Sequence, residues 1–198
     1  MRTPVRMANL LCLGAALLIG ASFLTPLWSL TAQAVQYKMD FPQGLKVYLY
    51  LWKIAGEMYE LNLMNKWIGA HFPERALEMI LFPILFGGVA LACVACLFLS
   101  RWKKRALMAA LLGLLLLTLV GLVSLQGRLY AFGHVRDANP PIVVPDFTVP
   151  ILGTMQLWNW TISTAFGVGA YILALAALLL ALAYVVTARE ARNERTWS

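Results

Sequence analysis

Four long apolar runs dominate the pattern of hydrophobic and polar positions along the chain. They cover residues 8–28, 79–99, 106–126 and 166–187, and none of them contains Asp, Glu, Lys, Arg or His. A helix needs about 20 apolar residues to cross a hydrocarbon core roughly 30 Å thick, and it satisfies its own backbone hydrogen bonds there. The pattern therefore predicts four transmembrane helices, with two long outer segments at 29–78 and 127–165.

The composition supports a membrane-embedded chain. Hydrophobic residues make up 61% of the 198 residues and charged residues 13%, whereas soluble domains contain about 45–50% apolar and about 25% charged residues. These proportions exclude a disordered chain, a disulfide scaffold and a water-soluble enzyme. We therefore expect an all-α membrane protein that forms a single integral membrane domain over residues 1–198.

The distribution of basic residues indicates the orientation in the membrane. Acidic and basic residues balance in the two outer segments, so the formal net charge of +7 lies beside the opposite face of the bundle. Basic residues near helix ends stay preferentially in the cytoplasm. We therefore place both termini inside, in a bacterial inner membrane, with both outer segments ordered and extracytoplasmic. The charge indicates contact with anionic lipid, because no nucleic-acid-binding module is recognisable.

The first 34 residues also resemble a secretory signal peptide. Arg2 and Arg6 precede the first apolar run, and Ala32-Gln33-Ala34 matches the A-x-A pattern of a cleavage site. The run is longer than the roughly 7 to 15 apolar residues of a signal peptide, and a long spacer separates it from the site. We therefore favour retention of this segment as the first membrane helix.

The sequence of the first outer segment predicts regular secondary structure. Residues 45–54 are rich in aromatic and apolar residues, which is typical of a strand or of a segment lying at the membrane interface. Residues 57–68 place apolar side chains at intervals of three to four, which predicts an amphipathic helix lying flat on the bilayer.

The second outer segment predicts an ordered but extended loop. Closely spaced prolines and glycines interrupt regular helix there. Tyr130, Phe132, Trp158 and Trp160 fit an aromatic belt where two helices leave the membrane.

Few residues that could carry chemistry lie inside the apolar runs. Both histidines, His71 and His134, lie outside them, so we expect no intramembrane b-type haem and no proton relay through the bundle. Cys93 and Cys96 form a C-x-x-C on one side of a helix, and Cys12 lies at similar depth. We favour packing between helices, because a free cysteine behaves as a small hydrophobe, but binding of a soft metal or thiol exchange stays open.

His134 and Asp137 are the candidate metal ligands outside the runs. Two ligands make a weak site, because structural zinc sites use four and catalytic ones three. A local hydrogen bond that orders the proline-containing loop is the plainer interpretation. No set of nucleophile, base and orienting group is recognisable, so we expect no independent catalytic activity.

Spaced motifs in the two outer segments resemble a family of small four-helix membrane proteins of unclear activity. Members are found beside copper and cytochrome c respiratory genes, including atypical nitrous oxide reductase clusters. The motifs are Phe41-Pro42-x-Gly44-Leu45, Gly56-x-x-Tyr59-Glu60-Leu61-Asn62-x-x-Asn65-x-x-Ile68-Gly69 and Gly133-His134-x-x-Asp137-x-x-Pro140-Pro141-Ile142-x-Val144-x-x-Phe147-Thr148-x-Pro150-x-x-Gly153.

The resemblance implies one metal site and one docking surface. The family's first motif continues as Asn-His-Tyr-Ile-Gly-Met, but this chain has Lys66 and Ala70 where that motif has histidine and methionine. His134 and Asp137 are therefore the ligand candidates that the resemblance leaves, with copper as the candidate metal. The docking surface for a membrane or periplasmic redox protein would comprise Tyr59, Glu60, Asn62, Asn65, Gly69, Pro140, Pro141 and Phe147.

Three functions remain open. The leading hypothesis is an accessory, assembly or docking protein for an extracytoplasmic copper or cytochrome c redox enzyme, whose helices are inert anchors in the lipid bilayer. The first alternative is a structural subunit of a larger membrane oxidase or oxygenase complex. The second is a transporter or channel for a neutral small molecule, since the runs are rich in glycine and alanine.

Overall fold

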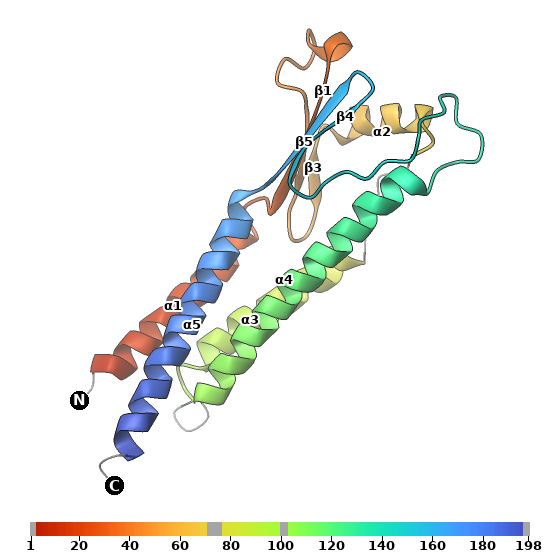
Figure 1. The fold of residues 1–198 in the computed structure, drawn as a ribbon. Coiled ribbons are helices and arrows are strands. Elements are labelled where there is room, and N and C mark those ends of the chain that lie inside the picture. Colours follow the sequence, from red (N-terminus) through yellow and green to blue (C-terminus); the bar gives the residue numbers. More distant parts are fainter. Residues whose placement is uncertain (1–2, 71–76, 100–102, 196–198) are drawn as a thin grey trace.

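The computed structural model describes residues 3–70, 77–99 and 103–195, and in it four long helices carry a mixed module at one end (Figure 1). The helices are α1 (Thr3–Ser22), α3 (Glu78–Ala95), α4 (Lys103–His134) and α5 (Val168–Arg195). The chain termini lie at the end remote from the module. Among the described residues, three helices are long and apolar enough to cross a membrane, namely α3, α4 and α5 as far as Glu190.

The first predicted span is shorter than expected. The apolar part of α1, Arg6–Ser22, is near the lower limit of the roughly 17 to 25 residues that suffice for a crossing. The helix ends before Thr25 because the residue that precedes a proline, here Pro26, is pushed away from helical backbone angles. Trp28, which we expected at the end of this helix, begins a strand instead.

The expectation of an all-α protein is wrong, because the module contains a five-stranded antiparallel sheet in the order β3-β2-β1-β5-β4. Burial alternates along β1, where Trp28 and Leu30 face inward and Ser29 and Thr31 face outward, as a half-buried strand requires. The strands are β1 (Trp28–Ala34), β2 (Leu45–Leu49), β3 (Ile54–Gly56), β4 (Gly153–Leu157) and β5 (Trp160–Phe166).

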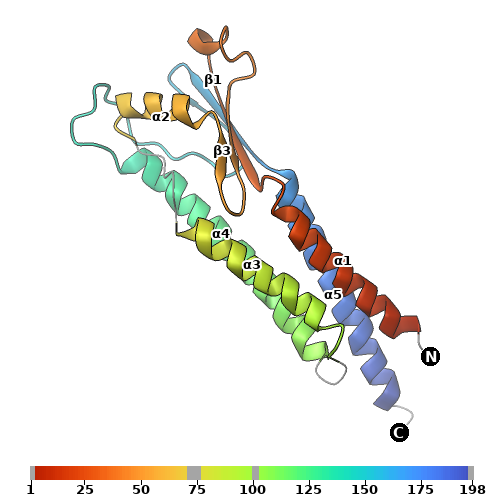
Figure 2. The same cartoon turned by 180° about the vertical axis from the view of Figure 1, so that it is seen from behind.

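The two central strands continue the closest pair of helices. Helices α1 and α5 make the most extensive helix contact, and β1 directly follows α1 while β5 directly precedes α5 (Figures 1 and 2). At the junction the Gly167 N–H donates to the Leu27 carbonyl at 2.9 Å. A Cβ atom at position 167 would lie 2.2 Å from the carbonyl oxygen of Pro26, so this crossing requires glycine.

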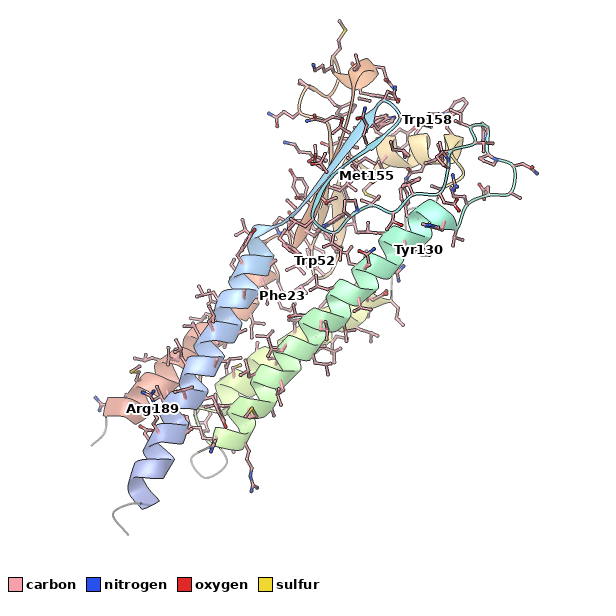
Figure 3. The ribbon with its side chains drawn as sticks, in the orientation of Figure 1. Phe23, Trp52, Tyr130, Met155, Trp158 and Arg189 are labelled. Atoms are coloured by element: carbon pink, nitrogen blue, oxygen red, sulfur yellow. The ribbon has the colours of Figure 1, made fainter. Side chains whose placement is uncertain are left out.

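The turn between β2 and β3 reaches back to the end of α1. The indole of Trp52 donates to the Phe23 carbonyl at 3.1 Å, and the Lys53 ammonium lies 4.5 Å from the centre of the Trp52 ring (Figure 3). The predicted strand at 45–54 is confirmed only for β2, because residues 50–53 turn the chain into β3. This turn fixes the sheet to the helices.

One face of the sheet packs on α2 (Met58–Trp67), on the end of α4 and on the extended segment 135–152. Trp28 lies in this core, and its indole donates to the Ile151 carbonyl at 2.7 Å. The predicted helix at 57–68 is confirmed as α2. Its buried side, with Leu61 and Asn65, faces the protein, so contact with the module explains its apolar face better than a position on the bilayer.

The second outer segment is only partly the extended loop that we expected. Helix α4 continues two turns beyond the predicted span to His134, and β4 and β5 form a hairpin. The aromatic belt is wrong for Trp158 and Trp160, because β5 carries Trp160 about 20 Å from the start of α5. Figure 3 shows Trp158 at the far tip of the hairpin.

Candidate ligand cavity between the helix pairs

The helices pack closely over only half of their length. In the half remote from the sheet, residues from all four helices form one core, which includes Cys12, Cys93, Leu107 and Leu180. Nearer the sheet, the pair α1/α5 separates from the pair α3/α4. A partly open cavity of about 470 Å³ lies between them, and we call it the interhelical cavity.

Small residues on α4 and α5 leave this space free. Gly121 faces Phe82 of α3, and a Cβ atom at position 121 would lie 3.6 Å from that ring, in ordinary contact. Ala170, Ala174 and Ala177 occupy the facing side of α5. The larger apolar residues of the lining come from α3, α4, α5 and the sheet with its β2–β3 turn, and they include Phe82, Phe86, Leu122, Leu125, Leu173, Trp28, Leu49, Leu51 and Ile54.

A charged pair stands at the end of the cavity nearest the sheet. Glu78 opens α3 and Arg128 lies in the last turns of α4. The guanidinium donates to the two carboxylate oxygens from Nη2 at 2.5 Å and from Nε at 3.2 Å. The Ser124 hydroxyl donates to Glu78 Oε1 at 2.8 Å. Both charged side chains are partly exposed, so a ligand can reach them.

This arrangement suits an amphiphile. Ligand pockets commonly have volumes of about 300–1,000 Å³ and apolar walls with a few polar groups that fix orientation. The bonds to Glu78 use two of the five N–H donors of the Arg128 guanidinium, and a ligand oxygen can accept from the others. Leu115 and Tyr171 line the cavity and are exposed on α4 and α5, so the opening lies on helices of membrane-spanning length.

The predicted metal ligands His134 and Asp137 contact other protein groups in the structure. His134 Nδ1 lies 2.9 Å from the Tyr130 carbonyl, and its ring stacks on that of Tyr130 with centroids 3.9 Å apart. The Asp137 N–H donates to the Gly69 carbonyl at 2.9 Å. Within the described residues, no three His, Cys, Asp or Glu side chains gather at one point. His71 lies outside the described residues, and the copper site stays a prediction.

Two of the predicted docking residues, Gly69 and Pro140, lie where the two outer segments meet. Gly69 lies against Asp137 and Pro140, and the Ile142 N–H donates to the Trp67 carbonyl at 2.9 Å. Asn65 and Phe147 are buried, and Glu60, Asn62 and Pro140 are partly buried. Tyr59 and Pro141 are exposed.

The three cysteines are free thiols, buried in the core that the four helices share. Cys12 comes from α1, and Cys93 and Cys96 come from the end of α3. Their burial agrees with the packing interpretation.

Sequence reasoning missed the pair of Glu78 and Arg128. We treated both residues as outer charges that balance each other. A signal was present, because α3 ends at Ala95 and α4 begins soon after at Lys103. Two helices so close in the chain tend to pack antiparallel, which brings the start of the first beside the end of the second. The cavity has no comparable signal, since it depends on how far the helix pairs diverge.

Comparison with protein families and curated proteins indicates no function for this chain, so the geometry of the site is the basis for a proposal. The chain matches no protein-family model, and no curated protein is significantly similar to it. The resemblance of the outer segments to the respiratory family therefore stays a prediction.

Proposed function

We propose that this chain is a membrane-embedded binding protein for an amphiphilic molecule of the lipid phase. The interhelical cavity would take the apolar body of the molecule, and Glu78, Arg128 and Ser124 would face its polar end. The observation that carries the proposal is an apolar volume of about 470 Å³ with one charged pair at a single end. The proposal develops the alternative of a carrier for a small molecule.

Binding fits the helices better than conduction. A continuous pore would have to pass the half of the bundle remote from the sheet. Leu107, Leu114 and Leu180 are fully buried there, together with Ala183. Close packing of such side chains leaves few voids that a water molecule could enter. This packing favours a binding site over a continuous channel.

Filling the cavity tests the proposal. The substitution Gly121→Leu adds a side chain beside Phe82, where there is room for a first methyl group and a cavity beyond it. Each methylene of a ligand displaced from apolar surroundings costs about 0.8 kcal/mol, so losing three or four of them lowers affinity more than tenfold. Native mass spectrometry of the protein with added palmitic acid or lysophosphatidylcholine counts the bound molecules.

The matched control is Gly88→Leu. Gly88 is exposed on α3, nothing described lies within 4 Å of its missing Cβ, and it does not line the cavity. We expect one bound amphiphile in the wild type and in this control, and a loss of at least tenfold in occupancy for Gly121→Leu. Equal occupancy in all three proteins would contradict the proposal.

We also propose that the sheet module lies outside the cytoplasm and that both termini lie inside, in a bacterial inner membrane. The described basic residues Arg6, Lys103, Lys104, Arg105 and Arg189 support this orientation, because they lie at the helix ends remote from the sheet. Such residues favour the cytoplasmic side.

Labelling of introduced cysteines tests the orientation. Gln43 is exposed in the module, and Arg189 is exposed near the other end of α5 (Figure 3). In spheroplasts, a membrane-impermeant maleimide should modify Gln43→Cys while the inner membrane is intact and Arg189→Cys only after permeabilisation. The buried native cysteines provide a low background. The reverse pattern of labelling would invert the proposed topology.

The accessory or docking role is a second candidate. It is favoured by an ordered module that carries Tyr59 and Pro141 exposed on its surface, where a partner could contact them. Copper and the respiratory partner rest on the family resemblance alone. Co-migration of the chain with a redox enzyme on a native gel, lost in Tyr59→Ala, is the result that this role requires. The same gel tests the structural-subunit alternative, in which Tyr59→Ala would leave co-migration intact.

A further inference from the structure

A second cavity lies inside the sheet module, separate from the interhelical cavity. Its volume is about 430 Å³, and it lies between the inner face of the sheet, α2, the end of α4 and the extended segment. Leu129 lines both cavities and so stands between them. We call the second space the module pocket.

Asn65 supplies an unusual polar group to the wall of the module pocket. It lies in the last turn of α2 with 4% of its surface exposed. Its carbonyl accepts from the Ile68 and Ala70 N–H groups, which hold the end of the helix in place. Its side-chain Nδ2 is buried, and it has no hydrogen-bond partner in the part of the chain that the structure describes. Buried polar groups are rarely left unpaired, so this amide calls for an acceptor from outside the described residues.

The rest of the pocket is apolar, aromatic and uncharged. Its lining contains no Asp, Glu, Lys, Arg or His among the residues that the structure describes. Two exposed tryptophans, Trp67 and Trp158, contribute to the lining. The Tyr37 and Trp160 rings lie 5.4 Å apart.

The rim of the pocket is held in a defined shape. The Asn159 amide donates to Gln36 Oε1 at 2.7 Å, which joins the β4–β5 turn to the short 3-10 helix Val35–Tyr37. Trp158, in the same turn, has φ of 55°, a left-handed conformation that is uncommon for a bulky residue and recurs at ligand clamps.

We propose that the module pocket binds a neutral molecule with a flat hydrophobic body and a hydrogen-bond acceptor such as a carbonyl oxygen. The aromatic rings contact the body, and the Asn65 amide donates to the acceptor. A charged ligand is disfavoured, because no lining residue compensates the loss of its hydration. This site is independent of the proposed function, since it lies in another cavity and uses other residues.

Benzophenone is a suitable probe, because it has two rings, one carbonyl group and photoreactivity that marks its position. The full chain in lipid nanodiscs is illuminated with benzophenone, and the labelled peptides are mapped by mass spectrometry. We expect labelling within residues 61–68 and 157–162, which line the module pocket. Labelling confined to the membrane helices would overturn the proposal.

Substitutions separate the module pocket from non-specific binding. Asn65→Leu removes the donor and should lower labelling of the module pocket about three- to tenfold, as expected for the loss of one hydrogen bond. Labelling of residues 170–177, in the interhelical cavity, should not change. The control Asn139→Leu makes the same substitution at an exposed position outside the pocket and should behave as the wild type. Equal labelling in Asn65→Leu and the wild type overturns the proposal.

Two further measurements keep the test decisive. Trp158 is exposed, so Trp158→Ala should fold, and it should also reduce labelling of the module pocket. Diphenylmethane has the two rings of benzophenone without the carbonyl, so it should compete about three- to tenfold less well than a non-photoreactive aromatic ketone of similar size. Equal competition by both compounds, or unchanged labelling in Trp158→Ala, counts against the site.

Discussion

The substitution Gly167→Ala is expected to destabilise the protein by about 3 kcal/mol, the upper end of the range for an overpacked site. The added Cβ would lie 2.2 Å from the Pro26 carbonyl oxygen and 2.7 Å from its carbon. Both are backbone atoms, so relief requires the crossing of α1 and α5 to open. Equilibrium unfolding in mixed micelles with increasing sodium dodecyl sulfate measures the loss of stability.

Hydrogen exchange distinguishes a local effect of Gly167→Ala from a general loss of stability. Protection from hydrogen exchange should fall first in β1 and β5, because the lost contact joins the turns that lead into them. The matched control is Gly20→Ala in α1, where no described residue lies within 4 Å of the new methyl group. Alanine is the better helix former, so the control should be as stable as the wild type or slightly more stable. A similar loss in both variants would show that the close crossing is not the cause.

Removing either member of the pair of Glu78 and Arg128 is expected to cost more than removing both. The substitution Glu78→Leu leaves a guanidinium facing an apolar cavity, and Arg128→Leu leaves a carboxylate there. An exposed ion pair contributes about 0.2–1 kcal/mol, whereas breaking a buried pair costs about 3–5 kcal/mol. These side chains are partly exposed, so we expect a coupling free energy of about 1–3 kcal/mol.

A double-mutant cycle in lipid nanodiscs measures this coupling directly. Thermal unfolding of the wild type, the two single variants and the double variant gives the four free energies that the cycle requires. Ser124→Ala is the control, because it removes the hydroxyl that donates to the Glu78 carboxylate without leaving a charge unpaired, and it should cost about 1–2 kcal/mol. Additive effects of the two leucine substitutions would mean that the pair does not stabilise the fold.

The helical part of the fold could be predicted because its signals are local. Each membrane helix is a continuous apolar run, and α2 shows its three-to-four-residue period within a single segment. The limits of the helices were less accurate, since α4 continues beyond the apolar run through Arg128 to His134. Such an extension is stabilised by contacts with the sheet module, which the local sequence does not reveal.

The sheet could not be predicted as a unit, because its central pairing joins distant segments. Ser29 and Ala165 are partners in the β1–β5 register and are 136 positions apart in the chain. The strand β1 follows an apolar run directly, which made its first residues look like the end of a span. Ser29 and Thr31 on its outward face carry the alternation that could have marked it as a strand.

The candidate site consists of a charged pair and a cavity, and only the charged pair could be predicted from the sequence. The meeting of Glu78 and Arg128 follows from the antiparallel arrangement of α3 and α4, once their limits are known. The volume beside them results from small side chains such as Gly121 and Ala174 facing each other across diverging helices. Which small residues face a void and which face a neighbour is decided by tertiary packing, so no pattern in one segment shows it.

Because β1 follows α1 and β5 precedes α5, the sheet and these two helices are connected and can move as one arm of the molecule. The sheet and its two attached helices form one arm, and α3 with the lower part of α4 forms the other. Trp28 in the roof of the cavity and Ala174 in its wall both belong to the first arm, and Phe82 belongs to the second. A force on the sheet would therefore be transmitted to α1 and α5 and would change the width of the cavity.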